Sequence, residues 1–253
     1  MTLLEVKDLS VTYGDRVIVK DVAFSLEEGA WLMIAGPNGA GKSTVVNGVS
    51  GAVPYGGTVR CMGRELRDYR PGELARRIGV LAQNHFVGYA FTVGEVVDLG
   101  RYAYGGGVFR GRDDGGREAV ERALRLTGLE ELANRSVLSL SGGELQRVFL
   151  AQLFAQDPAV LILDEPTNHL DLVYQKQLLT LVSRWLETPG RGVISVVHDL
   201  SLARAYGTEA VLMKEGRIEA RGTPAAVFAP EHLERVYEMD VHRWMRELLG
   251  QWS

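Results

Sequence analysis

The residues best suited to chemistry read GPNGAGKST, from Gly36 to Thr44, and fit the phosphate-binding pattern G-x-x-x-x-G-K-[ST]. Their glycines permit a backbone path that points successive N–H groups at phosphate oxygens, at the start of a helix. Lys42 would place a positive charge between the β- and γ-phosphates, and the Ser43 hydroxyl suits a hard cation such as Mg²⁺. An apolar run at 31–35 comes directly before the loop. The pattern therefore predicts a strand, a phosphate cradle and a helix, and hence a nucleotide site.

Two carboxylates follow a second apolar run. Residues 160–163 are aliphatic and are followed by Asp164, Glu165 and Pro166, which is typical of an interior strand of a parallel sheet. In an open α/β sheet, ligands bind at the carboxyl ends of the strands. We therefore expect both carboxylates beside the phosphate loop. A structural salt-bridging role is the alternative.

The sequence LSGGE at 140–144 predicts another helix start. Ser141 stands where an N-cap would stand and two glycines follow it. Apolar residues then recur at helical spacing: Leu145, Val148, Phe149, Leu153 and Phe154. This is a second helix start able to bind an anion, unless it is only a capped helix.

The remaining pattern predicts the elements that position these residues. Short apolar segments at 3–30 indicate an antiparallel β layer. Helices are expected at 93–101 and 118–126, the second with a stripe at Val120, Ala123 and Leu124 and a cap at Gly128, and a surface loop at 105–116. A helix to about Leu186, a strand at 193–197, a helix from Ser201 and a hairpin around 214–216 follow. Alternating elements specify an α/β fold.

The final segment, 230–253, contains apolar residues that we expect to pack on the core as a stripe; a partner-binding helix is the alternative. These residues are Leu233, Val236, Tyr237, Trp244, Leu248 and Leu249.

Composition favours one soluble domain with an embedded subdomain. The chain has 253 residues and 46% hydrophobic content, enough for a large core. No apolar stretch approaches the roughly 20 residues that span a bilayer, and the beginning, MTLLEVKDLS, lacks the features of a signal peptide. The single Cys61 predicts a packed or edge-strand thiol in a reducing compartment. With 28 basic and 32 acidic residues, nucleic acid is not expected as a partner.

Taken together, the motifs resemble those of the ATP-binding subunit of an ABC transporter. They are the loop at 36–44, the Q-loop Gln83, the signature LSGGE, LILDEP at 161–166, the D-loop at 168–171 and the switch His198, in the family's order. The resemblance implies an ABC-type P-loop NTPase core at 31–83 and 159–229, within a single ABC ATPase domain, 1–253. It also implies an antiparallel β subdomain at 1–30, an inserted helical subdomain at 84–158 and a helical tail at 230–253.

The resemblance also implies a role for each site residue. ATP would stack its adenine on Tyr13 and place its phosphates in the loop at 36–44. Ser43, Gln83 and Asp164 would hold Mg²⁺, Glu165 would act as general base, and Lys42, Gln83 and His198 would assist catalysis. The residues expected to contact ATP are Tyr13, Gly36, Pro37, Asn38, Gly39, Ala40, Gly41, Lys42, Ser43 and Thr44, with Ser141, Gly142, Gly143 and Glu144 of the signature.

Partners follow from the same resemblance. A second copy would bind head-to-tail, so that Ser141 and Gly143 of one chain face the γ-phosphate held by the other. Permease subunits would sit over the insertion at the cytoplasmic face of the membrane, where the chain would be peripheral, near Val93, Val96, Val97 and Arg101. An external substrate-binding protein would be an indirect partner.

Three stretches, at 92–104, 167–179 and 222–241, resemble importers of iron chelates, haem and cobalamin. Glu144 replaces the commoner Gln of the signature, and Ala103 stands where these importers often have Pro. The chain is thus expected to power uptake of a metal chelate, an iron complex first. The alternatives are an importer ATPase for another solute and a soluble ABC ATPase of iron–sulfur cluster assembly. An ATPase of DNA repair or chromosome organisation would need a long coiled coil, which is not indicated here.

Overall fold

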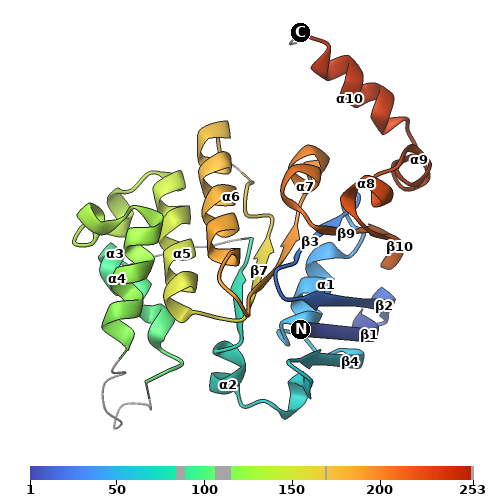
Figure 1. Ribbon diagram of the computed structural model, residues 1–253. Coiled ribbons are helices and arrows are strands. Elements are labelled where there is room, and N and C mark those ends of the chain that lie inside the picture. Colours follow the sequence, from blue (N-terminus) through green and yellow to red (C-terminus); the bar gives the residue numbers. More distant parts are fainter. Residues whose placement is uncertain (84–88, 106–114, 169, 252–253) are drawn as a thin grey trace.

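The computed structural model describes residues 1–83, 89–105, 115–168 and 170–251. It contains two sheets, one of four strands and one of six. The helical insertion and the four-stranded sheet lie on opposite sides of the six-stranded sheet (Figure 1). The mixed sheets and their helices confirm the predicted α/β class.

The six-stranded sheet has the order β10-β9-β3-β8-β7-β6. Its strands are β3 (Trp31–Ala35), β6 (Ile78–Leu81), β7 (Val160–Asp164), β8 (Gly192–Val196), β9 (Glu209–Lys214) and β10 (Arg217–Gly222). All pairs are parallel except β9 with β10. Every residue of β3, β7 and β8 is buried, because both faces of the sheet are covered.

Side chains of the central strands alternate between two cores. In β3, Trp31, Met33 and Ala35 belong to one core and Leu32 and Ile34 to the other. The first core lies under α5 (Gly142–Gln156), α6 (Leu172–Leu186) and α7 (Leu200–Tyr206); the second lies under α1 (Lys42–Val49) and the antiparallel sheet. A continuous apolar strand thus contributes side chains to both hydrophobic cores, since successive side chains point to opposite faces of the sheet.

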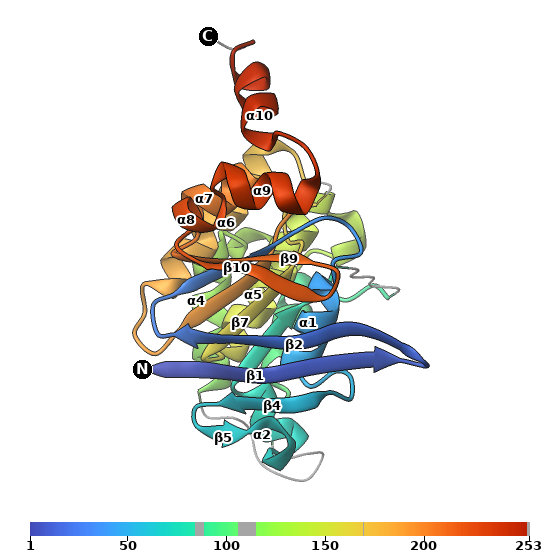
Figure 2. The same cartoon turned by 90° about the vertical axis from the view of Figure 1, so that its right-hand side faces the viewer.

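The antiparallel sheet is larger than the expected β subdomain. It has the order β2-β1-β4-β5, from β1 (Thr2–Tyr13), β2 (Arg16–Glu27), β4 (Gly56–Cys61) and β5 (Arg64–Glu65), and Figure 2 shows it as one layer. The strands at 56–65 therefore complete a layer that the sequence placed at 1–30. Cys61 is fully buried opposite Leu4, and burial raises the pKa of its thiol to about 11. It is the packed thiol that was predicted.

The insertion is helical. It contains α3 (Val93–Asp98), followed by a 3₁₀ turn at Leu99–Arg101, then α4 (Gly116–Thr127) and α5. Gly128 ends α4 in the left-handed conformation at φ +65°, as predicted from its position. A short helix, α2 (Pro71–Ala75), precedes β6. Most of the surface loop expected at 105–116 lies outside the described residues.

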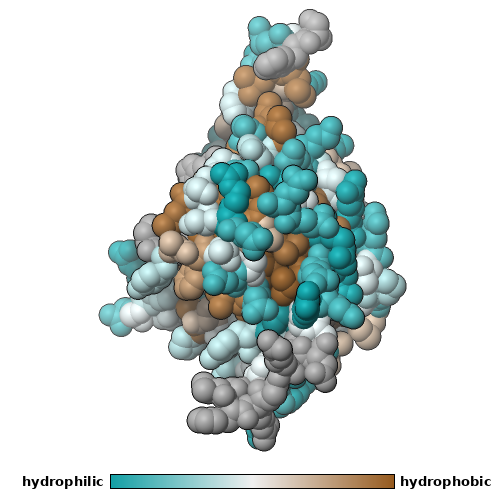
Figure 3. All heavy atoms as spheres, turned by 90° about the vertical axis from the view of Figure 1, so that its left-hand side faces the viewer, coloured by the Kyte–Doolittle hydropathy of each residue, from teal (hydrophilic) through white to brown (hydrophobic). Residues whose placement is uncertain are grey.

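Three residues expected beside a permease are instead part of the core. Val93, Val96 and Val97 are at most 3% exposed and pack in the first core. The exposed apolar side chains of this segment are Leu99 and Tyr102, at 51% and 85%. The valines lie on the inner side of α3, against α5, so a partner would meet the turn that follows. On the side of the molecule formed by the insertion, hydrophobic patches lie among hydrophilic residues (Figure 3).

The C-terminal tail is only partly packed. After a short helix, α8 (Pro224–Val227), the tail forms α9 (Pro230–Tyr237) and α10 (Val241–Leu249). Leu233 and Val236 of α9 are buried, whereas Trp244, Leu248 and Leu249 of α10 are exposed. The predicted stripe is thus correct for α9 and wrong for the end of α10, which projects from the body (Figure 1). In the parts of the chain that the structure describes, no helix combines the length and apolarity needed to cross a bilayer.

The burial of Val96 predicts a loss of stability when a charge is placed there. Val96→Asp should lower the free energy of unfolding in urea by about 3 kcal/mol or more, because an unpaired carboxylate enters an apolar core. Leu99→Asp, an exposed change on the same segment, should cost no more than about 0.5 kcal/mol. Equal effects of the two substitutions would contradict this account of α3.

Candidate functional site

The phosphate loop joins the end of β3 to the start of α1. Gly36 has φ +147° and Gly41 has φ +93°, both in the region that favours glycine. A Cβ at Gly36 would overlap the Met213 carbonyl, and one at Gly41 would lie 3.2 Å from the Ile18 carbonyl oxygen. Strands β9 and β2 therefore pack closely against the outside of the loop. Only glycine fits at these two positions.

The Lys42 side chain is turned back onto its own loop. Its Nζ donates to the carbonyl oxygens of Gly36 and Pro37, at 2.8 and 2.9 Å, and the residue is 4% exposed. Burial lowers the pKa of the amine, while the carboxylates of Glu165 and Asp164 act in the opposite direction. To reach a bound phosphate, Lys42 has to exchange these two carbonyls for phosphate oxygens.

Ser43 and Asp164 form an oxygen pair beside Lys42. The Ser43 hydroxyl donates to Asp164 Oδ1 over 3.1 Å, and Asp164 is 7% exposed. Burial raises the pKa of the Asp164 carboxyl, opposed by that hydrogen bond. These hard oxygen donors fit Mg²⁺. Among the residues that the structure describes, no three or more His, Cys, Asp and Glu gather as a metal cage, so such an ion would take other ligands from phosphate and water.

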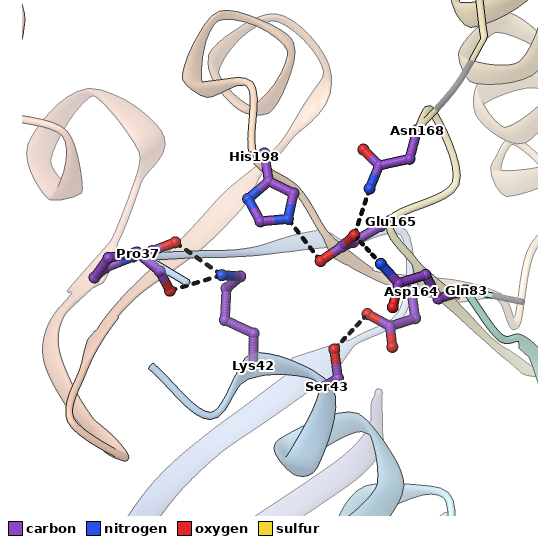
Figure 4. Close-up of polar contacts among 9 residues, drawn as sticks. Pro37, Lys42, Ser43, Gln83, Asp164, Glu165, Asn168 and His198 are labelled. Atoms are coloured by element: carbon purple, nitrogen blue, oxygen red, sulfur yellow. Dashed lines mark hydrogen bonds and ion pairs between the residues drawn. The ribbon is translucent and has the colours of Figure 1, made fainter. Parts of the chain in front are cut away.

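The Glu165 carboxylate is the point at which three polar side chains meet (Figure 4). It follows β7 with φ +53°, and its N–H donates to the Val196 carbonyl at 3.1 Å. Its Oε1 lies 2.6 Å from His198 Nε2, and its Oε2 accepts a hydrogen bond from Gln83 Nε2 at 2.5 Å. Asn168 Nδ2 also donates to Oε2. Both oxygens of the carboxylate are therefore held by neighbouring side chains.

These contacts follow from the sheet. Gln83 comes just after β6, Glu165 after β7 and His198 after β8, and β6-β7-β8 are neighbours. Parallel strands end at one edge, so the three side chains converge beside Lys42. A carboxylate held by three donors is oriented, and it can accept a proton from water once one donor moves away.

Tyr13 lies at the turn between β1 and β2. It is the last residue of β1 and is 47% exposed, and β2, which follows, passes the loop at Ile18. An exposed ring on this hairpin is free to accept a stacked base, which stays a prediction.

The signature forms a helix start on the insertion. Ser141 caps α5, and its Oγ accepts from Glu144 N at 3.3 Å, while Glu144 Oε2 accepts from Ser141 N and Oγ, each at 2.8 Å. These bonds to Ser141 lower the pKa of the Glu144 carboxyl. Glutamate thus completes a capping box. Ser141 and Gly142 are exposed, and within the described residues no hydrogen bond joins 141–144 to the loop at 36–44.

Two contacts in this region were not predicted from the sequence. Asn168 was noted only as part of the D-loop, yet it binds Glu165. Tyr174 packs on the signature, since a Cβ at Gly143 would lie 2.5 Å from its ring. An amide three residues after a carboxylate was the available signal for the first contact. For Tyr174, which lies in the next helix, we see no signal in the sequence.

Comparison with known proteins identifies close relatives. Residues 19–168 match the family described as ABC transporter. An uncharacterised ABC transporter ATP-binding protein of Bacillus subtilis is 40% identical over 239 residues, covering 94% of this chain and 54% of the relative. The ferric enterobactin transport ATP-binding protein of Escherichia coli is 38% identical, with 91% and 85% covered. The hemin import ATP-binding protein of Pseudomonas entomophila is 40% identical, with 94% of each covered. The chain thus spans about half the length of the Bacillus relative.

Solved structures share the fold. A proposed metal-chelate type ABC transporter in an inward-facing conformation has a TM-score of 0.82 at 24% identity, with 95% of this chain and 90% of that chain covered. The cbiO1 protein of Clostridium perfringens, part of an ABC transporter complex, has a TM-score of 0.79 at 28% identity, with 98% of each chain covered.

The position of Glu165 predicts a separation of binding from turnover. Glu165→Gln should hydrolyse ATP at least ~100-fold more slowly, because the amide cannot accept a proton from water. Its ATP affinity should stay near that of the parent, since Lys42 and Ser43 are unchanged. Phosphate release and nucleotide binding measure the two effects, with Glu187→Gln, an exposed carboxylate at the end of α6, as control. Parental turnover in Glu165→Gln would remove this residue from the role of base.

Proposed function

Because the chain belongs to the ATP-binding proteins of the ABC transporter family, and is therefore an ATPase, we propose that it powers uptake of a metal chelate through a separate permease. The observation that carries the ATPase mechanism is the convergence of Gln83, Glu165 and His198 beside Lys42. The relatives named for ferric enterobactin and hemin transport support the transported class.

In the proposed mechanism, the loop at 36–44 binds the phosphates and Lys42 leaves the Gly36 and Pro37 carbonyls for them. Ser43, Asp164 and Gln83 would hold Mg²⁺, which supplies charge neutralisation on the phosphates. Glu165 orients the attacking water and accepts its proton, and His198 donates toward the γ-phosphate. Tyr13 stacks on the adenine, a contact that contributes about 1 to 3 kcal/mol in other systems.

A second copy completes the site. Of the two signature residues expected to face the partner's nucleotide, Ser141 is exposed, whereas Gly143 is buried beside the ring of Tyr174. In a head-to-tail dimer, Ser141 and the helix start that contains Gly143 would face the γ-phosphate held by the partner's loop, with two ATP molecules at a twofold interface. ATP would hold the two copies together, and its hydrolysis would release them.

The permease is proposed to sit on the insertion. Leu99 and Tyr102 are exposed on the turn after α3. Movement of the Q-loop on hydrolysis would pass to a partner bound there. The chain would act at the cytoplasmic face of the membrane as a peripheral subunit, and an external binding protein would deliver the chelate to the permease.

Uptake in cells lacking this protein tests the transported class. Accumulation of a radiolabelled ferric siderophore should fall to background, with haem and cobalamin as the next substrates to measure. It should be restored by the parent gene and not by Lys42→Ala. Normal accumulation of all three, with a defect for a sugar or peptide, would overturn the substrate class and leave the ATPase standing.

The shared site predicts opposite behaviour for two substitutions. Ser141→Arg should leave ATP affinity of the isolated chain unchanged and abolish ATP-dependent dimers in a Glu165→Gln background, because the charge enters the interface. Lys42→Ala should weaken ATP binding in its own chain by roughly 10-fold to 100-fold. Size-exclusion chromatography and nucleotide titration measure these effects. Thr188→Arg, at the opposite edge of the sheet, is the control. Loss of monomer affinity in Ser141→Arg would exclude action on the partner's nucleotide.

A further inference from the structure

A cavity of about 600 Å³ lies where three parallel strands begin. Its wall includes Arg77, Ala159 and Arg191, which directly precede β6, β7 and β8. Parallel strands begin at one edge of a sheet just as they end at the other, so these residues converge. Figure 1 shows α2, which also contributes to the wall, at the lower end of the molecule, where β7 begins. The cavity is therefore separate from the phosphate loop, which follows the carboxyl end of β3.

The wall of this cavity carries more positive than negative charge. Four arginines line it, Arg64, Arg76, Arg77 and Arg191, together with two carboxylates, Glu73 and Asp157. The chain as a whole has a formal charge of −4, so the cavity is opposite in sign to the protein that surrounds it. Guanidinium groups gathered around one space repel one another, and an anion in that space relieves the repulsion.

Two of the arginines are paired within the chain. Arg191 pairs with Asp157 over 2.5 Å, and Arg64 pairs with Glu73 over 3.5 Å. These two contacts use both carboxylates of the wall. They help to fix its shape, and they leave the positive charge of the other two arginines without a neutralising carboxylate on the wall.

Arg76 and Arg77 are the arginines that remain for a ligand. Arg76 donates from Nε to the Ala103 carbonyl at 2.8 Å, and its guanidinium carbon lies 4.9 Å from the centre of the Tyr104 ring. These contacts orient the guanidinium through one of its donors. Within the described residues, its two terminal nitrogens and the whole Arg77 guanidinium make no hydrogen bond or ion pair. Both side chains are exposed, so a solute can reach them.

The shape of the cavity favours a small ligand. Its wall comes from three parts of the chain: residues 62–77, Tyr104 of the insertion, and residues 157–159 and 188–191 of the core. A volume of about 600 Å³ is typical of small-molecule sites. A guanidinium binds a phosphate through two parallel N–H bonds. Two neighbouring guanidiniums are therefore suited to two linked phosphate groups.

We propose that this cavity binds a small diphosphate-type anion through Arg76 and Arg77, at a site separate from the ATP site. Each guanidinium would hold one phosphate group. The bound anion would contact the core and lie beside Tyr104, so it would tie the insertion to the edge at which β6, β7 and β8 begin. Those three strands end at Gln83, Glu165 and His198.

Titration of pyrophosphate into the full chain carrying Lys42→Ala tests the proposal, because this background weakens binding at the phosphate loop. Pyrophosphate should bind with one-to-one stoichiometry in calorimetry. Arg76→Gln and Arg77→Gln, each added to this background, should weaken binding about tenfold, since each removes charge-assisted hydrogen bonds. The control is Arg122→Gln, an exposed arginine of α4, which should leave the affinity unchanged. Because all three arginines are exposed, thermal midpoints without ligand should stay close to that of the background.

Three further results decide the identity of the ligand. Inorganic phosphate should bind more weakly than pyrophosphate, and equal affinity would contradict the use of two guanidiniums. ADP carries the same diphosphate group, and the tighter of ADP and pyrophosphate shows whether the site takes a nucleotide or the free anion. In either case Arg77→Gln should weaken the binding.

Absence of pyrophosphate and ADP binding in the Lys42→Ala background would overturn the proposal, and so would binding that Arg76→Gln and Arg77→Gln leave unchanged. Equal weakening by Arg122→Gln would also overturn it, as a general effect of charge. Binding of an acidic peptide in place of either anion would make the cavity a protein-docking surface and exclude the proposed ligand. None of these outcomes bears on ATP hydrolysis at the phosphate loop, so the proposed function stands or falls separately.

Discussion

Burial of the parallel sheet on both faces is the constraint on which the site depends. Strands β3, β7 and β8 carry no exposed residue, so charged side chains stand only where these strands end. Because the strands are parallel, the ends lie at one edge. Lys42, Glu165 and His198 follow three different strands and still meet at this edge. The parallel arrangement of the strands is enough to bring them together.

The same edge explains which parts of the site the sequence could predict. A continuous aliphatic run that stops at a charge marks both the strand and its functional end, so Asp164 and Glu165 were readable from residues 160–165 alone. The phosphate loop could be predicted from its glycines. Only glycine fits at position 36, where a Cβ would overlap the Met213 carbonyl of β9. The order of the motifs supplied the family. The hydrogen bond from Asn168 to Glu165 was not predicted, because a single amide gives no periodic signal in the sequence.

Amphipathic patterns were less informative, for a physical reason. The spacing of Val93, Val96 and Val97 shows that α3 has an apolar side, but it cannot say whether that side meets this chain or a partner. Packing on α5 decides the question, and the valines are buried. The tail shows the reverse case, because α9 packs its apolar side whereas Trp244 and Leu248 of α10 remain exposed. Likewise, strands at 56–65 joined the β layer through long-range pairing with β1, which short-range patterns do not encode.

The charged groups of the site are held by hydrogen bonds from within the chain. Lys42 donates to two loop carbonyls, Asp164 accepts a hydrogen bond from Ser43, and Glu165 is held by His198, Gln83 and Asn168. Such pairing limits the cost of burying charge at the sheet edge. It also means that nucleotide binding is an exchange of partners, in which each new contact replaces an internal one. Affinity therefore depends on how well the surrounding backbone is fixed before the exchange, and that backbone is supported by β2 and by the β9–β10 hairpin as well as by the motif itself.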